Sequence, residues 1–177
     1  MSVAANRYAK ALIDALYPDR AEAGYEQLQR LSELLRKQPD ARRILENPTL
    51  PADRRKAFLK QIGDALGFIP PLTNFTEILV ERNRLDILEE IAQVYQKFLD
   101  ERMGIVRAAV TAAQALDATQ SRELATKLQA VTGKQVRMEV VVDPALLGGV
   151  IARVGSTIYD GSLRQQLNSF KARLVQE

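Results

Sequence analysis

The chain has 177 residues, contains neither cysteine nor histidine, and carries a net charge of only +3. These absences exclude disulfides, thiol chemistry and histidine-based acid–base catalysis and remove the commonest metal ligands, so we expect no metal or cofactor. The small basic excess is not the dense stripe typical of nucleic-acid-binding proteins. No apolar run approaches the roughly 20 residues of a membrane span, and residues 1–10 lack the apolar segment of a signal peptide.

The first half of the chain repeats apolar residues at helical spacing in one segment after another. Pro18, Pro39, Pro48 and Asn83 interrupt the pattern and indicate short loops. We expect helices over residues 2–16, 19–38, 39–45, 51–66, 72–82 and 85–99. Six helices joined by short loops predict a compact bundle over residues 1–103.

The first and fifth of these segments are apolar on more than one side. In the first, Val3, Tyr8, Ala11 and Ala15 lie on a different side from Ala9 and Ile13. The same all-round character extends over residues 75–80 of the fifth segment. Such a helix is either fully buried in its own bundle or offers a second face to a partner helix. The residues alone leave both possibilities open.

The period of the pattern changes after Gly104. We expect strands over residues 105–113, 136–142, 150–154 and 157–159, a helix capped by Asp117 and ended by Gly133, and a final helix capped by Ser162. The residues expected to face the core include Leu124, Leu128, Val131, Val136, Met138, Val140 and Val142. The chain is therefore α+β overall, with an all-α N-terminal bundle followed by a small α/β module of order β-α-β-β-β-α over residues 104–177.

Two features of the second half have a possible chemical use. Asp143 and Asp160 are a candidate carboxylate pair for an enzyme that works without histidine, but Asp-Pro and Asp-Gly steps favour local turn formation instead. Gly148-Gly149 lacks the spacing of a phosphate-binding loop and precedes a strand rather than a helix. Turn geometry is the preferred interpretation of both features.

Short basic runs are the main support for the alternative function, a nucleic-acid-binding helical protein. Arg42-Arg43 and Arg54-Arg55-Lys56 lie on predicted helices that also carry Glu46 and Asp53. Mixed charge of this kind is typical of a solvated helix face. We therefore expect no nucleic-acid partner.

Several segments resemble the delta subunit of bacterial F-type ATP synthase, the counterpart of the mitochondrial oligomycin-sensitivity-conferring protein. The similar stretches are the opening-helix motif at residues 7–12, the junction at residues 79–85 that ends Asn83-Arg84-Leu85, and the C-terminal signature over residues 140–150, 153–155 and 160–164. The family often has glycine where Asn83 stands and a further arginine where Gln166 stands. Asparagine tolerates the left-handed backbone conformation, so we expect the turn to be kept.

The resemblance implies a non-catalytic stator subunit that ties the catalytic head to the peripheral stalk, so that the head resists rotor torque. It implies that the bundle receives the N-terminal helix of an alpha subunit in a groove between its first and fifth helices. The residues expected there are Tyr8, Ala11, Leu12, Ala15, Ile78, Leu79 and Arg82. It further implies that the C-terminal module binds the b subunits, and the residues expected to do so are Leu163, Leu167, Phe170 and Leu174. The implied location is peripheral, at the cytoplasmic face of a bacterial plasma membrane, without membrane insertion.

Overall fold

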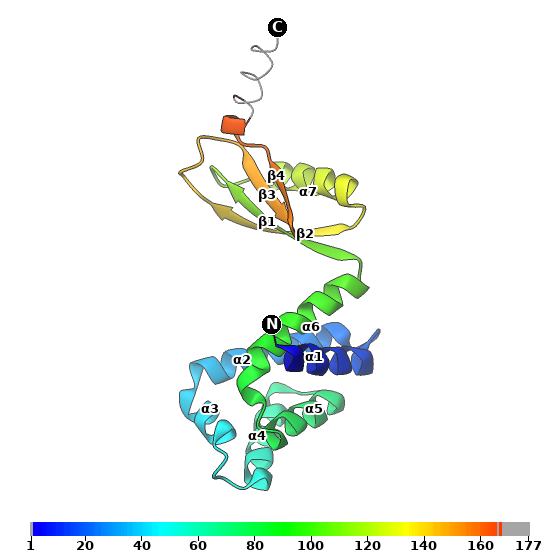
Figure 1. Cartoon of the computed structure of the whole chain (residues 1–177), viewed down its shortest axis with the longest axis vertical. Helices are drawn as coiled ribbons and strands as arrows, with labels where there is room; N and C mark the ends of the chain where they lie inside the picture. Colours follow the sequence, from blue (N-terminus) through cyan, green and yellow to red (C-terminus); the bar gives the residue numbers. More distant parts are fainter. Residues whose placement is uncertain (1, 166, 168–177) are drawn as a thin grey trace. The chain divides into compact units, whose positions relative to one another are not determined.

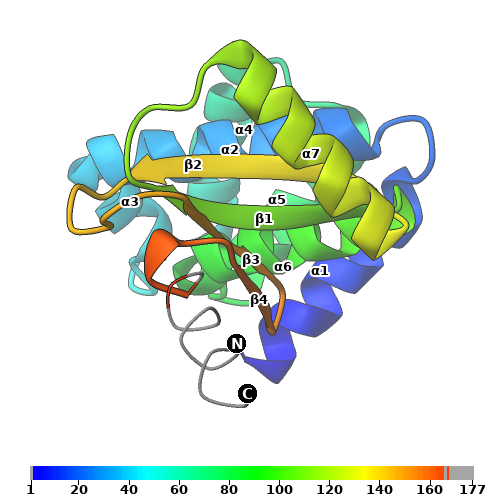
Figure 2. The same cartoon turned by 90° about the horizontal axis from the view of Figure 1, so that it is seen from above.

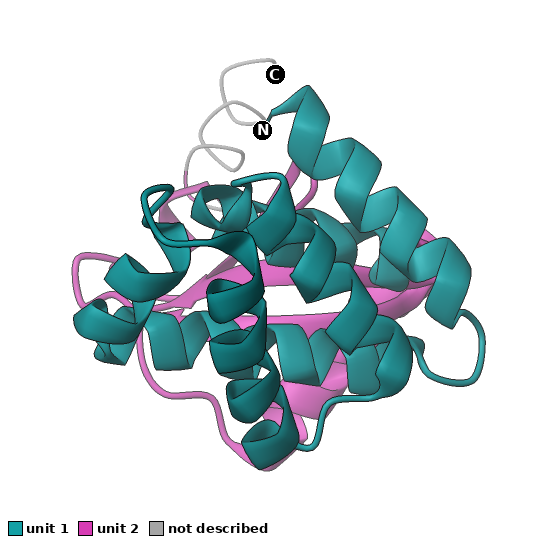
Figure 3. Ribbon diagram, turned by 90° about the horizontal axis from the view of Figure 1, so that it is seen from below, with its two compact units in different colours: residues 1–100 teal, residues 101–177 magenta. Residues whose placement is uncertain are grey.

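The computed structural model describes residues 2–165 and 167. The chain divides into two compact units, residues 1–100 and 101–177 (Figure 3), where the sequence pattern placed the division after residue 103. Across the described residues, no helix has both the length and the apolar character needed to cross a membrane.

Unit 1 is the predicted helical bundle (Figure 1). Its elements are α1 (Val3–Leu16), α2 (Ala21–Lys37), α3 (Pro39–Glu46), α4 (Ala52–Leu66), α5 (Pro70–Glu81), the 3-10 turn η1 (Leu85–Ile87) and α6 (Leu88–Arg102). The prediction of about six helices is confirmed. The fifth begins at Pro70, two residues earlier than expected, because proline has no N–H to lose and suits the first turn of a helix.

The start of α1 is fixed by Ser2 and by a carboxylate on α6. The Ser2 hydroxyl accepts a hydrogen bond from the backbone N–H of Ala5 at 3.1 Å, which is the predicted N-cap. The same hydroxyl donates to Oε2 of Glu90 at 2.7 Å, and the Ser2 backbone N–H donates to the other carboxylate oxygen. These two bonds, the side-chain bond first, hold the pKa of Glu90 below its ordinary value. The first turn of α1 is therefore attached to α6.

The core of unit 1 is closely packed where α1, α2 and α6 meet. Tyr95 on α6 is completely buried, and its hydroxyl donates to the carbonyl of Ala21 at 2.9 Å. Gly24 on α2 lies against Leu16 and the Tyr95 hydroxyl, and a Cβ at this position would collide with Leu16. The helices approach this closely because position 24 has no side chain.

Unit 2 is a four-stranded sheet with a helix on one face (Figures 1 and 2). Its elements are β1 (Ile105–Ala112), α7 (Ala118–Thr132), β2 (Gln135–Val142), β3 (Val150–Val154) and β4 (Thr157–Asp160), and the strand order is β2-β1-β3-β4. α7 connects the parallel pair β1 and β2, and a two-residue turn connects the antiparallel pair β3 and β4. Asp117 and Gln120 form the predicted capping box, and Gly133 ends α7 in the left-handed conformation.

Three residues expected in the core of unit 2 are exposed. Val140 and Val142 are 41% and 46% exposed, and Val131 is 64% exposed. The two valines lie in the second half of β2, an edge strand that has a neighbour on one side only. Val131 lies in the last turn of α7, beyond Leu124 and Leu128, which do pack in the core. The spacing of apolar residues shows which side of a helix or strand faces inward. It does not show how far along the element the core extends.

Candidate helix-docking groove and C-terminal surface

A groove of about 750 Å³ lies between α1 and α5. Its lining combines apolar and charged side chains. The lining residues are Ala4, Arg7, Tyr8, Lys10, Ala11, Asp14, Ile78, Arg82 and Arg84.

The two apolar sides of α1 have different uses. One side packs into the bundle core through Ala5, Ala9, Leu12, Ile13 and Leu16, which are all buried. The other side contributes to the groove through Ala4, Tyr8 and Ala11, spaced by four and three residues along the helix. This division explains why the helix is apolar on more than one side: one side lies in the core and the other lines the groove.

An aromatic pair joins the two walls of the groove. The Tyr8 ring of α1 meets the Phe75 ring of α5 edge to face, with centroids 6.2 Å apart and planes at 76°. Phe75 is 8% exposed and belongs to the core, while Tyr8 is half-buried and reaches the groove. Ile78, one turn further along α5, is 47% exposed. The groove thus presents an aromatic ring and an unburied aliphatic side chain on facing helices.

The seven predicted docking residues fall into three groups. Tyr8, Ala11, Ile78 and Arg82 line the groove, as a partner-binding residue must. Leu12 and Leu79 are 2% and 0% exposed and point into the core, so they support the groove from beneath. Ala15 is exposed but is not among the lining residues.

Sequence reasoning missed five lining residues. These are Ala4, Arg7, Lys10, Asp14 and Arg84. Ala4, Arg7 and Asp14 stand three or four residues from Tyr8 or Ala11, so helical spacing around those two residues was the available signal for them but not for Lys10. Arg84 lies beyond the end of α5 and is brought to the groove by a turn.

That turn contains Asn83, which stands where the family often has glycine. Asn83 has φ = 51°, a left-handed conformation, so the expectation that asparagine preserves the turn is confirmed. The N–H of Arg84 donates to the carbonyl of Leu79 at 2.8 Å, and the N–H of Asn83 donates to that of Val80 at 3.2 Å. This pair of bonds is a Schellman motif, which ends α5 and directs Arg84 to the groove.

Arg55 contradicts the interpretation of residues 54–56 as a solvated face. It is 4% exposed, and its Nη1 donates to the carbonyls of Leu45 and Val80, both at 3.2 Å, and to Oδ1 of Asn83 at 2.8 Å. Nη1 thus meets three acceptors, two of them carbonyls at the ends of α3 and α5 that carry partial negative charge, while Nε is buried without a hydrogen-bond partner among the described residues. Arg55 therefore fastens the Asn83 turn to α3 and α4.

Three of the other four basic residues of the runs are paired with carboxylates. Arg42 pairs with Glu46 at 2.8 Å, and Arg43 lies 3.6 Å from Asp40. Lys56 pairs with Glu81 at 3.0 Å. Phosphate binding would require these cations to exchange their present partners, so the runs give no support to the nucleic-acid alternative.

The C-terminal signature residues meet in space. Gly149 has φ = 83°, and a Cβ there would collide with the carbonyl oxygen of Gly161. The N–H of Gly161 donates to the carbonyl of Val150 at 2.9 Å, and that of Leu163 donates to the carbonyl of Gly148 at 3.0 Å. Gly148 and Gly149 thus allow residues 161–163 to come close to them. They form a tight turn of the kind expected from the sequence and not a phosphate loop.

Asp143 and Asp160 are both committed to local turns. An oxygen of Asp143 accepts from the N–H of Ala145, and one of Asp160 accepts from the N–H of Ser162, each at 2.9 Å. Hydrogen bonds from the Ser162 side chain and then its backbone hold the pKa of Asp160 below its ordinary value. Both carboxylates act as turn acceptors, which is the interpretation preferred from the sequence.

The C-terminal surface begins at Ser162, whose hydroxyl accepts from the N–H of Gln165 at 3.3 Å and so caps the predicted helix. Leu163 and Leu167 are 46% and 60% exposed, so neither belongs to the core of unit 2. The other two predicted stalk-binding residues, Phe170 and Leu174, lie outside the described residues.

Comparison with known proteins identifies the family. The sequence model of the ATP synthase delta (OSCP) subunit matches residues 4–174. The chain is 41% identical to ATP synthase subunit delta of Anaeromyxobacter sp. (strain Fw109-5), covering 99% of both chains. It is 39% identical to that of Myxococcus xanthus (strain DK1622), covering 97% of this chain and 96% of the relative.

A solved structure shares the fold. A chain of the Toxoplasma gondii mitochondrial ATP synthase hexamer superposes with a TM-score of 0.66 at 22% identity, over 99% of this chain and 98% of that one. The fold, the glycine contacts of the C-terminal signature and the full-length matches agree with the resemblance found in the sequence. The chain therefore belongs to the ATP synthase delta (OSCP) subunit family and is a non-catalytic stator subunit of ATP synthase.

Proposed function

We propose that this chain ties the catalytic head of ATP synthase to the peripheral stalk by docking the N-terminal helix of an alpha subunit in the groove between α1 and α5. Unit 2 binds the b subunits at its C-terminal surface. The assembly lies at the cytoplasmic face of a bacterial plasma membrane. The observation that carries the proposal is the groove itself, in which Ala11 and Ile78 are exposed and Tyr8 is only half-buried.

The shape of the groove suits a helix. Ala4 and Ala11 are small, so they allow a second helix to approach α1 closely. Tyr8 and Ile78 stand on facing walls and supply the kind of aromatic and aliphatic anchors that carry most of the energy of an interface. An amphipathic helix that places its apolar stripe between these walls buries both anchors.

A stator must dissociate slowly while the rotor applies torque. We expect affinity in the nanomolar range or better, which corresponds to about −12 kcal/mol. Because the bundle is already folded around the groove, little ordering of this chain opposes binding. Most of the conformational entropy lost on docking is therefore lost by the alpha segment.

Titration with a synthetic peptide of about 20 residues from the alpha N-terminus, followed by calorimetry and NMR, tests the groove. Ile78→Asp is expected to reduce affinity at least 100-fold, since it places a charge among apolar anchors. Ile44→Asp is a matched control, because Ile44 is 41% exposed in the last turn of α3 and does not line the groove. Failure of the wild-type chain to bind at micromolar peptide would overturn the docking assignment.

The b-subunit surface is proposed from the exposure of Leu163 and Leu167, with Phe170 and Leu174 as its continuation. Leu167→Gln is expected to weaken association with the soluble part of b in sedimentation experiments. Val131→Gln is the control, since Val131 is 64% exposed at the end of α7. Equal binding by the two variants would remove Leu167 from the interface.

A further inference from the structure

We infer that the helix accepted by the α1–α5 groove carries acidic residues on both sides of its apolar stripe. This inference rests on the proposed function and adds the chemistry of the partner. It follows from the charges that surround the groove and from how they are distributed over its two walls.

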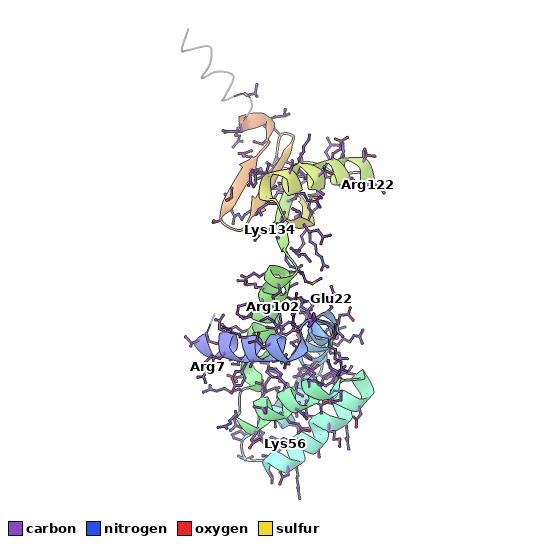
Figure 4. All side chains as sticks on the ribbon, turned by 90° about the vertical axis from the view of Figure 1, so that its right-hand side faces the viewer. Arg7, Glu22, Lys56, Arg102, Arg122 and Lys134 are labelled. Carbon is purple, nitrogen blue, oxygen red and sulfur yellow. The ribbon has the colours of Figure 1, made fainter. Side chains whose placement is uncertain are left out.

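Both walls of the groove carry cations. Arg7 and Lys10 stand on α1, and Arg82 and Arg84 stand at the end of α5 and just beyond it. Figure 4 labels Arg7 on α1. All four are exposed, while Asp14 is the one acidic residue among the described residues of the lining.

None of these four cations forms a salt bridge within the described part of the chain. Some basic side chains elsewhere in unit 1 do have carboxylate partners, including Lys37 with Glu33 at 2.7 Å and Arg42 with Glu46 at 2.8 Å. Lys56, also labelled in Figure 4, pairs with Glu81. With four cations and one acidic residue among its described lining residues, the groove carries an excess of positive charge.

The backbone beneath two of the cations is held in place. The Schellman motif at Asn83 sets the direction of the chain between Arg82 and Arg84. Arg55 holds that turn from beneath through Val80 and Asn83. The α5 wall thus presents its charges from a fixed backbone, which favours a partner whose charges stand at matching positions.

Docking makes the charges more effective. A helix seated between the walls excludes water from Tyr8 and Ile78, and the neighbouring cations then face the helix across a shorter and less polar gap. Glutamates on both flanks of the apolar stripe meet cations on both walls. Lysines at the same positions meet like charge on both walls and are repelled.

Two designed amphipathic peptides test the inference. They share one leucine and isoleucine stripe and differ only in carrying glutamate or lysine at the flanking positions. At low salt, the glutamate peptide is expected to bind about tenfold more tightly, because each partly exposed pair contributes modestly. At roughly 1 M salt, where the screening length is about 3 Å, most of the difference is expected to disappear. Equal affinities at low salt, or tighter binding of the lysine peptide, would overturn the inference.

Matched variants locate the effect. Arg7→Gln combined with Arg84→Gln is expected to remove most of the preference for glutamate, whereas Arg54→Gln, an exposed arginine on α4 outside the groove, is expected to leave it intact. A preference that survives the double variant would also contradict the inference. If the alpha peptide binds but the designed peptides do not differ, the docking function stands and the charge assignment falls. If neither the alpha peptide nor a designed peptide binds, both fall.

Discussion

Gly149 and Gly161 touch through their backbones at the point where the C-terminal signature closes: a Cβ on Gly149 would occupy the space of the Gly161 carbonyl oxygen. Gly149 also has φ = 83°, a conformation that side chains with a Cβ rarely adopt. The contact brings the residues after β2 and the residues before Leu163 together, which is where the exposed C-terminal surface begins.

Replacing Gly149 with alanine should therefore destabilise unit 2. We expect Gly149→Ala to lower the free energy of unfolding by about 3 kcal/mol, since backbone strain and a collision with backbone act together. Gly155→Ala is the control, because Gly155 has φ = 59° but open space around it and should cost only about 1 kcal/mol. Chemical denaturation followed by circular dichroism measures both, and equal losses would refute the role of the contact.

Removing Arg55 should destabilise unit 1. Arg55→Ala removes the hydrogen bonds to the carbonyls of Leu45 and Val80 and to Oδ1 of Asn83, and opens space in the core. We expect a loss of about 2–4 kcal/mol in the free energy of unfolding. Arg54→Ala changes the neighbouring exposed arginine and should stay within about 0.5 kcal/mol. A thermal melt in which the two variants coincide would show that the buried hydrogen bonds contribute nothing.

The attachment of Ser2 to Glu90 should be visible in a pH titration. Because the folded pKa of Glu90 is lowered, its contribution to stability is fully present above the ordinary value of 4.5 and is lost as pH falls through the folded pKa. Ser2→Ala removes the hydrogen bond from the Ser2 hydroxyl, which contributes most to the lowered pKa of Glu90. The pKa of Glu90 should therefore rise. Carboxyl NMR measures the shift. The lowered pKa of Glu33, which depends on Lys37, should not change, and an unmoved Glu90 would disprove the link.

Filling the groove should block docking without unfolding the bundle. Ala11 and Ala15 are both exposed on α1, but only Ala11 lines the groove. We expect Ala11→Trp to weaken binding of the alpha peptide at least tenfold, because the indole occupies the space of the incoming helix, with little change in melting temperature. Ala15→Trp should bind normally. Loss of affinity in the Ala15 variant as well would extend the docking surface beyond the groove.

Local patterns predicted the elements of this fold well. Ser2 and Asp117 have the side chains of helix caps, and each accepts the expected backbone hydrogen bond. Gly155-Ser156 predicted a two-residue hairpin, and Val154 indeed pairs with Thr157 across it. These features depend on residues within a few positions of one another, so the sequence contains all the information they require.

Tertiary packing decided which apolar side of each element is covered. Leu12 and Tyr8 both belong to the first helix, yet Leu12 is buried and Tyr8 reaches the groove, and the same holds for Leu79 and Ile78 on α5. Arg55 was expected on the surface and lies in the core, because the carbonyl ends of two other helices converge on it.

The sequence by itself determined the family, the order of the elements and their ends, because caps, turn glycines and apolar spacing act locally along the chain. Only the tertiary structure decided where the groove lies, which side chains line it and which cations surround it. Those depend on how close α1 comes to α5 and on the direction of the Asn83 turn, and both are set by contacts between residues far apart in the sequence.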